Sequence, residues 1–413
     1  MTDAALPFDT AKLDKLAEVA VRVGLNLQKG QDVLITAPVE ALPLVRRIAA
    51  AAYRAGAGVV TPILNDEEVT LARYKHGQDQ SFDRAPAWLF NGMAEAYSNN
   101  TARIAISADN PMLLSEQDPA KVSRVGKATS IAARPALEKI TRFETNWLVV
   151  SYPSVAWARQ VFPGLADEAA VGKLADAIFA ASRVDRDDPI AEWAAHDARL
   201  HERVDWLNGQ RFAALHFQSK GTDLTVGLAD GHAWKGGSSK ARNGIVCSPN
   251  VPTEEVFTTP HADRVNGTVR ATKPLVVRGT VIRDIAVRFE KGRIVESSAS
   301  SGEAVLKELL ATDEGAAKLG EVALVPNDSP ISNSGLLFFN TLFDENAACH
   351  IAQGQCYSEC FENEDLSKDE IAAAGGNSSL IHEDWMIGGP DTDIDGIKAD
   401  GTRVPVFRAG NWA

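Results

Sequence analysis

Two histidines near the C-terminal end of the chain have carboxylates close to them in the sequence. His350 follows Glu345 by five residues, and His382 stands two residues before Asp384. Apolar residues between flanking Gly-Gly pairs predict a strand over residues 379–387, and residues i and i+2 of a strand point to the same face. The imidazole and the carboxylate would then make a bidentate clamp, which suits zinc, cobalt or manganese.

Two adjacent carboxylates, Glu254 and Glu255, lie between two prolines in a stretch with strand-forming residues. If that strand is buried, one of the two acids must face inward, and a buried carboxylate needs a cation or several hydrogen-bond donors. Simpler explanations stay open at this point. The acid pair could lie on a solvated edge, and a His-x-Asp pair could form a surface hydrogen bond.

Cysteines offer a different metal hypothesis. Cys349, Cys356 and Cys360 lie close to His350, so the four side chains could form a structural Cys₃His zinc site. Only the spacing from Cys356 to Cys360 fits the usual pairs of zinc ligands, which favours buried thiols instead. Four cysteines are also too few for a disulfide scaffold in a chain of this length.

Length and composition limit the class of protein that must position these residues. A chain of 413 residues predicts two domains. The net charge of -13 argues against a nucleic-acid partner, since binding phosphates requires a basic face. Neither a signal pattern nor a run of about 18 apolar residues occurs, so we expect a cytoplasmic protein without a membrane partner.

The pattern of elements predicts an α/β fold. A strand over residues 32–37, a helix over 43–55 and a strand over 59–64 form a βαβ unit with a parallel pair, followed by further elements up to residue 107. The turn after the first strand lacks the glycines of a nucleotide-binding loop. We therefore predict a small N-terminal α/β domain, residues 1–109, and a larger, β-rich α+β catalytic domain, residues 110–413.

Two finer expectations concern helices of the second domain. A helix that begins near Val122 should break at Pro135, because proline removes a helical hydrogen bond. His196 and His201 are expected at the solvated edge of a helix over residues 190–207.

Four motifs in a fixed order resemble the metallo-aminopeptidases of the aminopeptidase T and aminopeptidase S group, and the resemblance covers essentially the whole chain. They are residues 253–258 (TEEVFT), 320–325 (GEVALV), 343–347 (FDENA) with His350, and 382–388 (HEDWMIG). The resemblance implies a homodimer and a site for two divalent ions (zinc, cobalt, manganese or magnesium), with Glu321 bridging both. The implied metal ligands are Glu255, Glu321, Glu345, His350, His382 and Asp384. Residues 353–360 depart from the family pattern, which bears on the substrate pocket more than on the metals.

The implied activity is removal of N-terminal residues from peptides with a free N-terminus, by water activated between two metals. Glu254 is the candidate general base, provided that the backbone bends enough to bring it to the site. Tyr357 matches a tyrosine of the family and could donate to the oxyanion, or could simply pack beside the site. A metal-dependent dipeptidase or amidase remains the alternative function, because leaving-group specificity is not written in the motifs.

Overall fold

A computed structural model describes residues 6–277 and 280–413. The chain forms two compact units, one of residues 1–196 and 238–252 and one of residues 197–237 and 253–413. This division differs from the expected boundary after residue 109, because strands later in the chain complete the sheet of the first unit.

The first unit combines strands with a set of helices. Its strands are β1 (Val33–Pro38), β2 (Val60–Asn65), β3 (Ala102–Ser107), β4 (Trp147–Ser151), β8 (Ser239–Lys240), β9 (Val246–Cys247) and β10 (Asn250–Val251). Its helices and turns are α1 (Thr10–Val19), η1 (Ala20–Gly24), η2 (Val39–Ala41), α2 (Leu42–Arg54), α3 (Glu67–His76), η3 (Asp79–Asp83), α4 (Ala87–Ser98), α5 (Pro119–Thr141), α6 (Val155–Val161) and α7 (Asp167–Ala181). The chain then enters α8 (Pro189–Gln210), whose later residues belong to the second unit.

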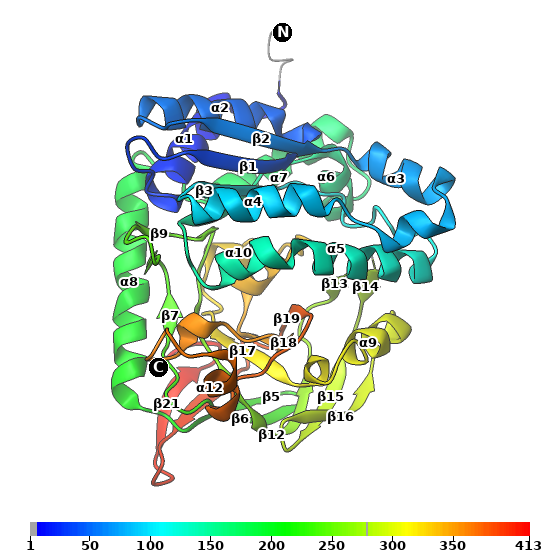
Figure 1. Ribbon diagram of the computed structural model, residues 1–413. Helices are drawn as coiled ribbons and strands as arrows, with labels where there is room; N and C mark the ends of the chain where they lie inside the picture. Colours follow the sequence, from blue (N-terminus) through cyan, green and yellow to red (C-terminus); the bar gives the residue numbers. More distant parts are fainter. Residues whose placement is uncertain (1–5, 278–279) are drawn as a thin grey trace. The chain divides into compact units, whose positions relative to one another are not determined.

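A parallel sheet in the order β10-β4-β3-β1-β2 is the centre of this unit. Helices cover both of its faces, with α1 and α2 on one side and α4 on the other (Figure 1). On β1, Val33 and Ile35 pack in the cluster that contains α1 and α2, whereas Leu34 packs with α4 and α5. The alternation buries both faces, which is typical of parallel sheets, and the predicted βαβ unit is confirmed.

Two details of the helices were predicted wrongly. The helix α5 continues through Pro135. The carbonyl that loses its helical partner belongs to Ile131, which is 60% exposed, so water can take the place of that partner. His196 is buried, with Nδ1 3.1 Å from Arg183 Nη2, while His201 is half-buried at the solvated edge, as expected.

The second unit consists mainly of strands, as predicted. They are β5 (Ala214–Ser219), β6 (Thr222–Leu228), β7 (Lys235–Gly236), β11 (Val256–Thr258), β12 (Pro260–Arg270), β13 (Leu275–Val277), β14 (Thr280–Ile282), β15 (Ala286–Glu290), β16 (Arg293–Ser298), β17 (Leu319–Leu324), β18 (His350–Gly354), β19 (His382–Met386), β20 (Asp393–Ile397), β21 (Arg403–Arg408) and β22 (Asn411–Trp412). The helices and turns are α9 (Glu303–Leu310), η4 (Gly315–Ala317), α10 (Pro330–Asn333), α11 (Thr341–Asp344), η5 (Glu345–Ala347), η6 (Ser358–Cys360) and α12 (Lys368–Ala373). The parallel sheet of the first unit and the antiparallel sheets of the second confirm the predicted α/β fold class.

Two antiparallel sheets share the core of the second unit. One has the order β16-β15-β12-β6-β5-β20-β21-β22, and the other has the order β19-β18-β17-β11-β7. Val322, Ile351 and Trp385 stand next to one another across the smaller sheet and lie in the same apolar cluster as residues of the larger sheet. Because side chains alternate along a strand, the other face of the smaller sheet is left for the polar residues between them.

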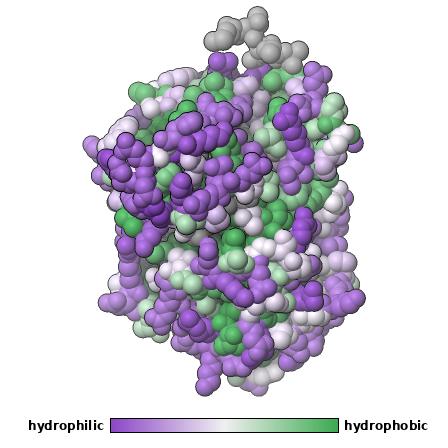
Figure 2. All heavy atoms as spheres, turned by 90° about the vertical axis from the view of Figure 1, so that its right-hand side faces the viewer, coloured by the Kyte–Doolittle hydropathy of each residue, from purple (hydrophilic) through white to green (hydrophobic). Residues whose placement is uncertain are grey.

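The surface matches the composition. Figure 2 shows a face that hydrophilic residues mostly cover, with hydrophobic residues in small patches between them, as is usual for protein surfaces. No helix in the described ranges combines the length and the apolar character needed to cross a bilayer.

Candidate metal centre

Four of the predicted site residues lie on one face of the smaller sheet. Glu321 on β17 is opposite Ala352 on β18, and Ala352 is opposite Asp384 on β19. His350 and His382 occupy the positions two residues away from Ala352 and Asp384 on these strands, so their side chains share that face. The predicted strand around His382 is confirmed, although β19 is shorter than expected.

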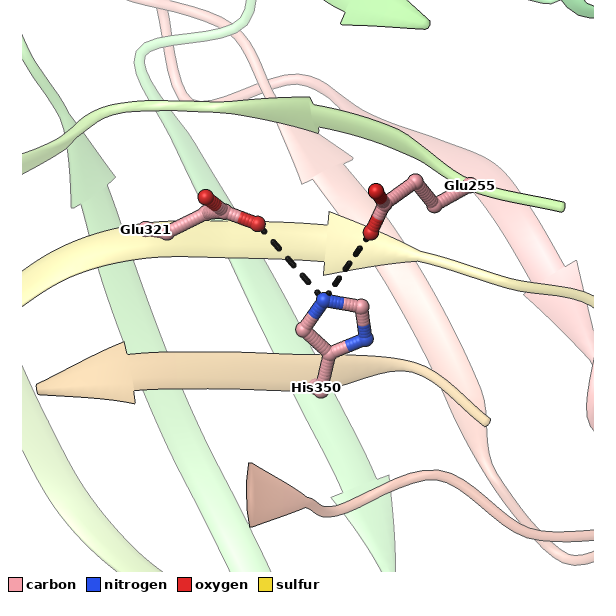
Figure 3. Close-up of side chains that lie close together, drawn as sticks. All are labelled: Glu255, Glu321 and His350. Atoms are coloured by element: carbon pink, nitrogen blue, oxygen red, sulfur yellow. Dashed lines mark ion pairs between the residues drawn. The ribbon is translucent and has the colours of Figure 1, made fainter. Parts of the chain in front are cut away.

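Glu255 reaches the same place from the segment that leads into β11. The Nε2 atom of His350 lies 3.1 Å from Oε2 of Glu255 and 3.5 Å from Oε1 of Glu321. Figure 3 shows both carboxylates pointing toward this one nitrogen. All three residues are buried, so water screens their charges little.

A second cluster forms around His382. Its Nε2 atom lies 3.6 Å from Oε2 of Glu321 and 3.5 Å from Oδ2 of Asp384. The described residues thus contain two groups that could hold a metal ion, and Glu321 belongs to both. Its two carboxylate oxygens face different imidazoles, which is the arrangement that a bridging ligand requires.

The other nitrogen of each imidazole lies beside a backbone carbonyl. His350 Nδ1 is 3.1 Å from the oxygen of Ala348, and His382 Nδ1 is 2.6 Å from the oxygen of Gln355. A carbonyl can only accept, so Nδ1 carries hydrogen in both rings and donates it. This fixes the ring orientation and directs each Nε2 into the carboxylate clusters, as metal-binding histidines usually require.

The pKa values of these groups reflect negative charge crowded into a buried space. Burial opposes protonation of His382, but Asp384 and Glu321 raise its pKa to about 10. The pKa of His350 is likewise raised well above its ordinary value by Glu255 and Glu321, against the effect of burial. Burial, together with the charge of Asp384, raises the pKa of Glu321 to about 7 although His350 acts to lower it. Without a metal, protons on these imidazole and carboxylate groups therefore offset the negative charge, and a divalent cation could replace them.

Glu345 lies near this group on a different element, the short turn η5. It stands outside the two tight clusters, and it is half-buried. Burial and the neighbouring charges of Glu255 and Asp384 raise its pKa well above the ordinary value. Its carboxylate therefore shares the electrostatic environment of both clusters.

The two predicted catalytic residues differ in how they relate to the site. The ring of Tyr357 lies 4.8 Å from that of His382 and 6.2 Å from that of Phe257, measured between centroids. Burial, and then the charges of Glu321 and Asp384, raise the pKa of Tyr357 well above its ordinary value, so its hydroxyl keeps its proton. Glu254 is buried beside Glu255, but neither metal-competent group includes it.

The cysteines do not form the alternative zinc site. Within the described ranges, neither metal-competent group contains a thiol. The four cysteines are buried thiols that form no disulfide with one another in the described residues, and burial raises the pKa of Cys349 to about 11 and that of Cys356 to about 12. Thiols with these pKa values hold their protons at neutral pH, as is usual for buried structural cysteines.

One residue at this site was not singled out by the sequence. Asn346 is fully buried, and its side-chain oxygen accepts a hydrogen bond from the backbone N–H of Glu254. In the sequence, the one indication of a role for Asn346 was its position beside Glu345 in the motif of residues 343–347. If this asparagine is buried, its side-chain amide must form hydrogen bonds with neighbouring groups.

Comparison with known proteins relates the chain to a family of metalloproteases. A family model described as thermophilic metalloprotease (M29) matches residues 9–412. Aminopeptidase T of Thermus thermophilus is 54% identical over 97% of this chain and 98% of the relative, and aminopeptidase 2 of Geobacillus stearothermophilus is 47% identical over 97% and 98%. The solved structure of wild-type AmpT from Thermus thermophilus matches with a TM-score of 0.92 and 52% identity, over 98% of this chain and 99% of that one.

These relatives favour an aminopeptidase over a dipeptidase, an amidase or a structural zinc protein. The metalloprotease family implies a divalent metal cofactor, and an aminopeptidase acts on peptide substrates. The chain therefore belongs to the thermophilic metalloprotease family M29 and is a metal-dependent aminopeptidase, as the resemblance implied.

Proposed function

We propose that this aminopeptidase binds two divalent ions that share Glu321. Glu255 and His350 would complete one position, His382 and Asp384 the other, and Glu345 would join them from η5. The observation that supports this most strongly is the pair of metal-competent groups with Glu321 in common.

The residues fit such ions by the chemistry of their free atoms. In the described part of the chain, Asp384 Oδ1 is buried without a hydrogen-bond partner, while Glu255 Oε2 and His350 Nε2 are buried and lie 3.1 Å from each other as an ion pair. Several buried carboxylates this close to one another need positive charge nearby. Oxygen and imidazole ligands without a thiolate suit zinc, cobalt, manganese or magnesium.

Two divalent ions, when bound, supply Lewis acidity and a nucleophilic water at neutral pH. Tyr357 would donate its hydroxyl hydrogen to the carbonyl oxygen of the substrate as negative charge develops there. Its raised pKa keeps that hydrogen in place, and the contact with His382 holds the ring beside the site. Glu254 is our candidate for carrying a proton to the leaving amine, because it is a buried carboxylate adjacent to Glu255.

Preference for chain ends would follow from charge. Glu255, Glu321, Glu345 and Asp384 would balance two divalent ions, and Glu254 nearby would leave the site negative. A buried negative site attracts the α-ammonium of a peptide strongly, because the effective dielectric is low. An internal peptide bond would present a neutral amide at that position.

We also propose a cytoplasmic homodimer. Four buried cysteines that form no disulfide in the described residues suit a reducing compartment, and the net charge of -13 argues against nucleic acid as a partner. The dimer rests on the family resemblance. Sedimentation at twice the chain mass of 44.3 kDa would support it, and a monomer at micromolar concentration would contradict it.

Metal removal and counting test the main proposal. A chelator should abolish cleavage of an aminoacyl p-nitroanilide, and zinc, cobalt, manganese or magnesium should restore it. Elemental analysis of the reloaded protein should give two ions per chain. Full activity in metal-free protein, or one ion per chain at saturation, would refute the dinuclear site.

A further inference from the structure

Two of the proposed metal ligands are not carried by strands. Glu321, His350, His382 and Asp384 lie on β17, β18 and β19, where ladder hydrogen bonds set their spacing. Glu255 instead lies just before β11, which begins at Val256, and Glu345 lies on η5. The ladder cannot by itself set the distance between these two carboxylates, so another contact must do it.

Asn346 makes that contact. Its side-chain oxygen accepts a hydrogen bond of 2.6 Å from the backbone N–H of Glu254, a residue 92 positions away in the sequence. The residue whose N–H is held in this way directly precedes Glu255, and Asn346 itself directly follows Glu345. One side chain thus joins the two segments that carry the ligands outside the strands.

The amide of Asn346 is itself held on its other side. Its Nδ2 donates to the carbonyl oxygen of Leu342 at 2.8 Å, which fixes the rotamer on its own turn of helix. Its backbone carbonyl accepts from the hydroxyl of Ser329 at 3.2 Å. The residue is 0% exposed, so water cannot replace these partners.

We propose that Asn346 is a positioning residue that sets the spacing of Glu255 and Glu345 for metal binding, without binding metal itself. This inference rests on the proposed ligand set. Residues that orient metal ligands in this way typically change metal affinity by about 10- to 100-fold when they are replaced.

Two substitutions separate the two hydrogen bonds of the amide. Asn346→Asp keeps an oxygen for the Glu254 N–H and loses the donor to Leu342. Asn346→Ser can still donate to the carbonyl of Leu342, as serine often does one turn back in a helix, but its side chain is too short to reach Glu254. If the Glu254 bond positions the ligands, the serine variant should bind zinc about 10- to 100-fold more weakly, and the aspartate variant should recover most of that loss.

A matched control comes from the first unit. Asn146 is also 0% exposed, and its side chain donates to the carbonyl of Leu25 at 2.7 Å and accepts from Gln31 at 2.6 Å. Asn146→Ser removes a comparable buried amide far from the proposed ligands in the chain. It should lower the melting temperature of the metal-free protein without changing the affinity for zinc.

The experiment is a calorimetric titration of metal-free protein with zinc, together with thermal unfolding in a chelator, for the wild type and these variants. Glu321→Gln in the same titration tests the ligand set independently. If Glu321→Gln weakens binding and Asn346→Ser does not, Asn346 is only structural and this inference is wrong. If neither weakens binding, the proposed metal site itself is wrong. Equal losses of zinc affinity for Asn146→Ser and Asn346→Ser would also overturn the positioning role. If Asn346→Ser fails to fold, the decision rests on Asn346→Asp, which must bind zinc within about tenfold of wild type.

Discussion

Replacing Glu321 by glutamine should be the most damaging conservative change at the metal centre. One carboxylate oxygen faces His350 at 3.5 Å and the other faces His382 at 3.6 Å. Glutamine has nearly the same shape, so the buried packing is preserved. It carries one oxygen and one NH₂ group, so one of the two metal positions loses its ligand atom, and both lose the negative charge.

The structure allows an estimate of the size of this loss. A unit negative charge about 4 Å from a unit positive charge contributes about 4 kcal/mol at the effective dielectric of 20 that suits protein sites. Each tenfold change in affinity corresponds to about 1.4 kcal/mol, so losing that charge weakens binding by about 10³-fold per unit of cation charge. We therefore expect at least one of the two ions to be lost at micromolar metal, with a fall in kcat of at least about 10³-fold.

The assay is metal content by elemental analysis together with steady-state hydrolysis of Leu-p-nitroanilide at saturating metal. Glu383→Gln serves as the control, because it removes the same charge from β19 at a residue that faces away from His382 and Asp384. The control should keep two ions and activity within about threefold of wild type, as for a charge outside the site. Near-normal turnover of Glu321→Gln with two bound ions would refute the bridging role of this carboxylate.

Four further outcomes test other parts of the proposal. N-acetylation of Leu-p-nitroanilide should lower kcat/KM by at least about a hundredfold, because it removes the α-ammonium; similar values for both substrates would contradict recognition of the chain end. Replacing Cys356 and Cys360 together by serine should leave the metal content unchanged, whereas loss of a zinc ion would revive the thiol site. Asp384 and Glu321 raise the pKa of His382 to about 10 against the effect of burial, so this ring is protonated at pH 8 and zinc binding should release at least one proton. Calorimetry in buffers of different ionisation enthalpy measures the number of protons released, and a value of zero would contradict this expectation. Burial raises the pKa of Glu321 from 4.5 to about 7, so ionisation favours the unfolded chain and the metal-free wild type should lose stability as the pH rises across that range. The Glu321→Gln variant should lose less stability over the same range. If the melting temperatures of both proteins change with pH in the same way, this carboxyl does not titrate as inferred.

Residues on strands were the part of the site that the sequence could place. The two-residue period of a strand predicts that His382 and Asp384 share one face, and β19 has that geometry. The βαβ unit was equally accessible, because its period changes from two to 3.6 and back within a short stretch. Sequence patterns of this kind predict the structure of one helix or strand and the turn that follows it, but not which distant segments come into contact.

Contacts between distant segments were beyond such rules. Glu255 meets His350, 95 residues further along the chain, because β11 and β18 both pair with β17, and no local pattern of residues 252–258 indicates that pairing. The motif resemblance chose Glu255 over Glu254, and a distance of 3.1 Å to His350 now gives that choice a physical reason. Asn346 illustrates the same limit more strongly. Its role depends on a backbone N–H 92 residues away, and an asparagine beside an acid has no chemical signature until the chain is folded. For this reason the residues that hold metal ligands in place are best sought among buried amides that link two ligand-bearing segments.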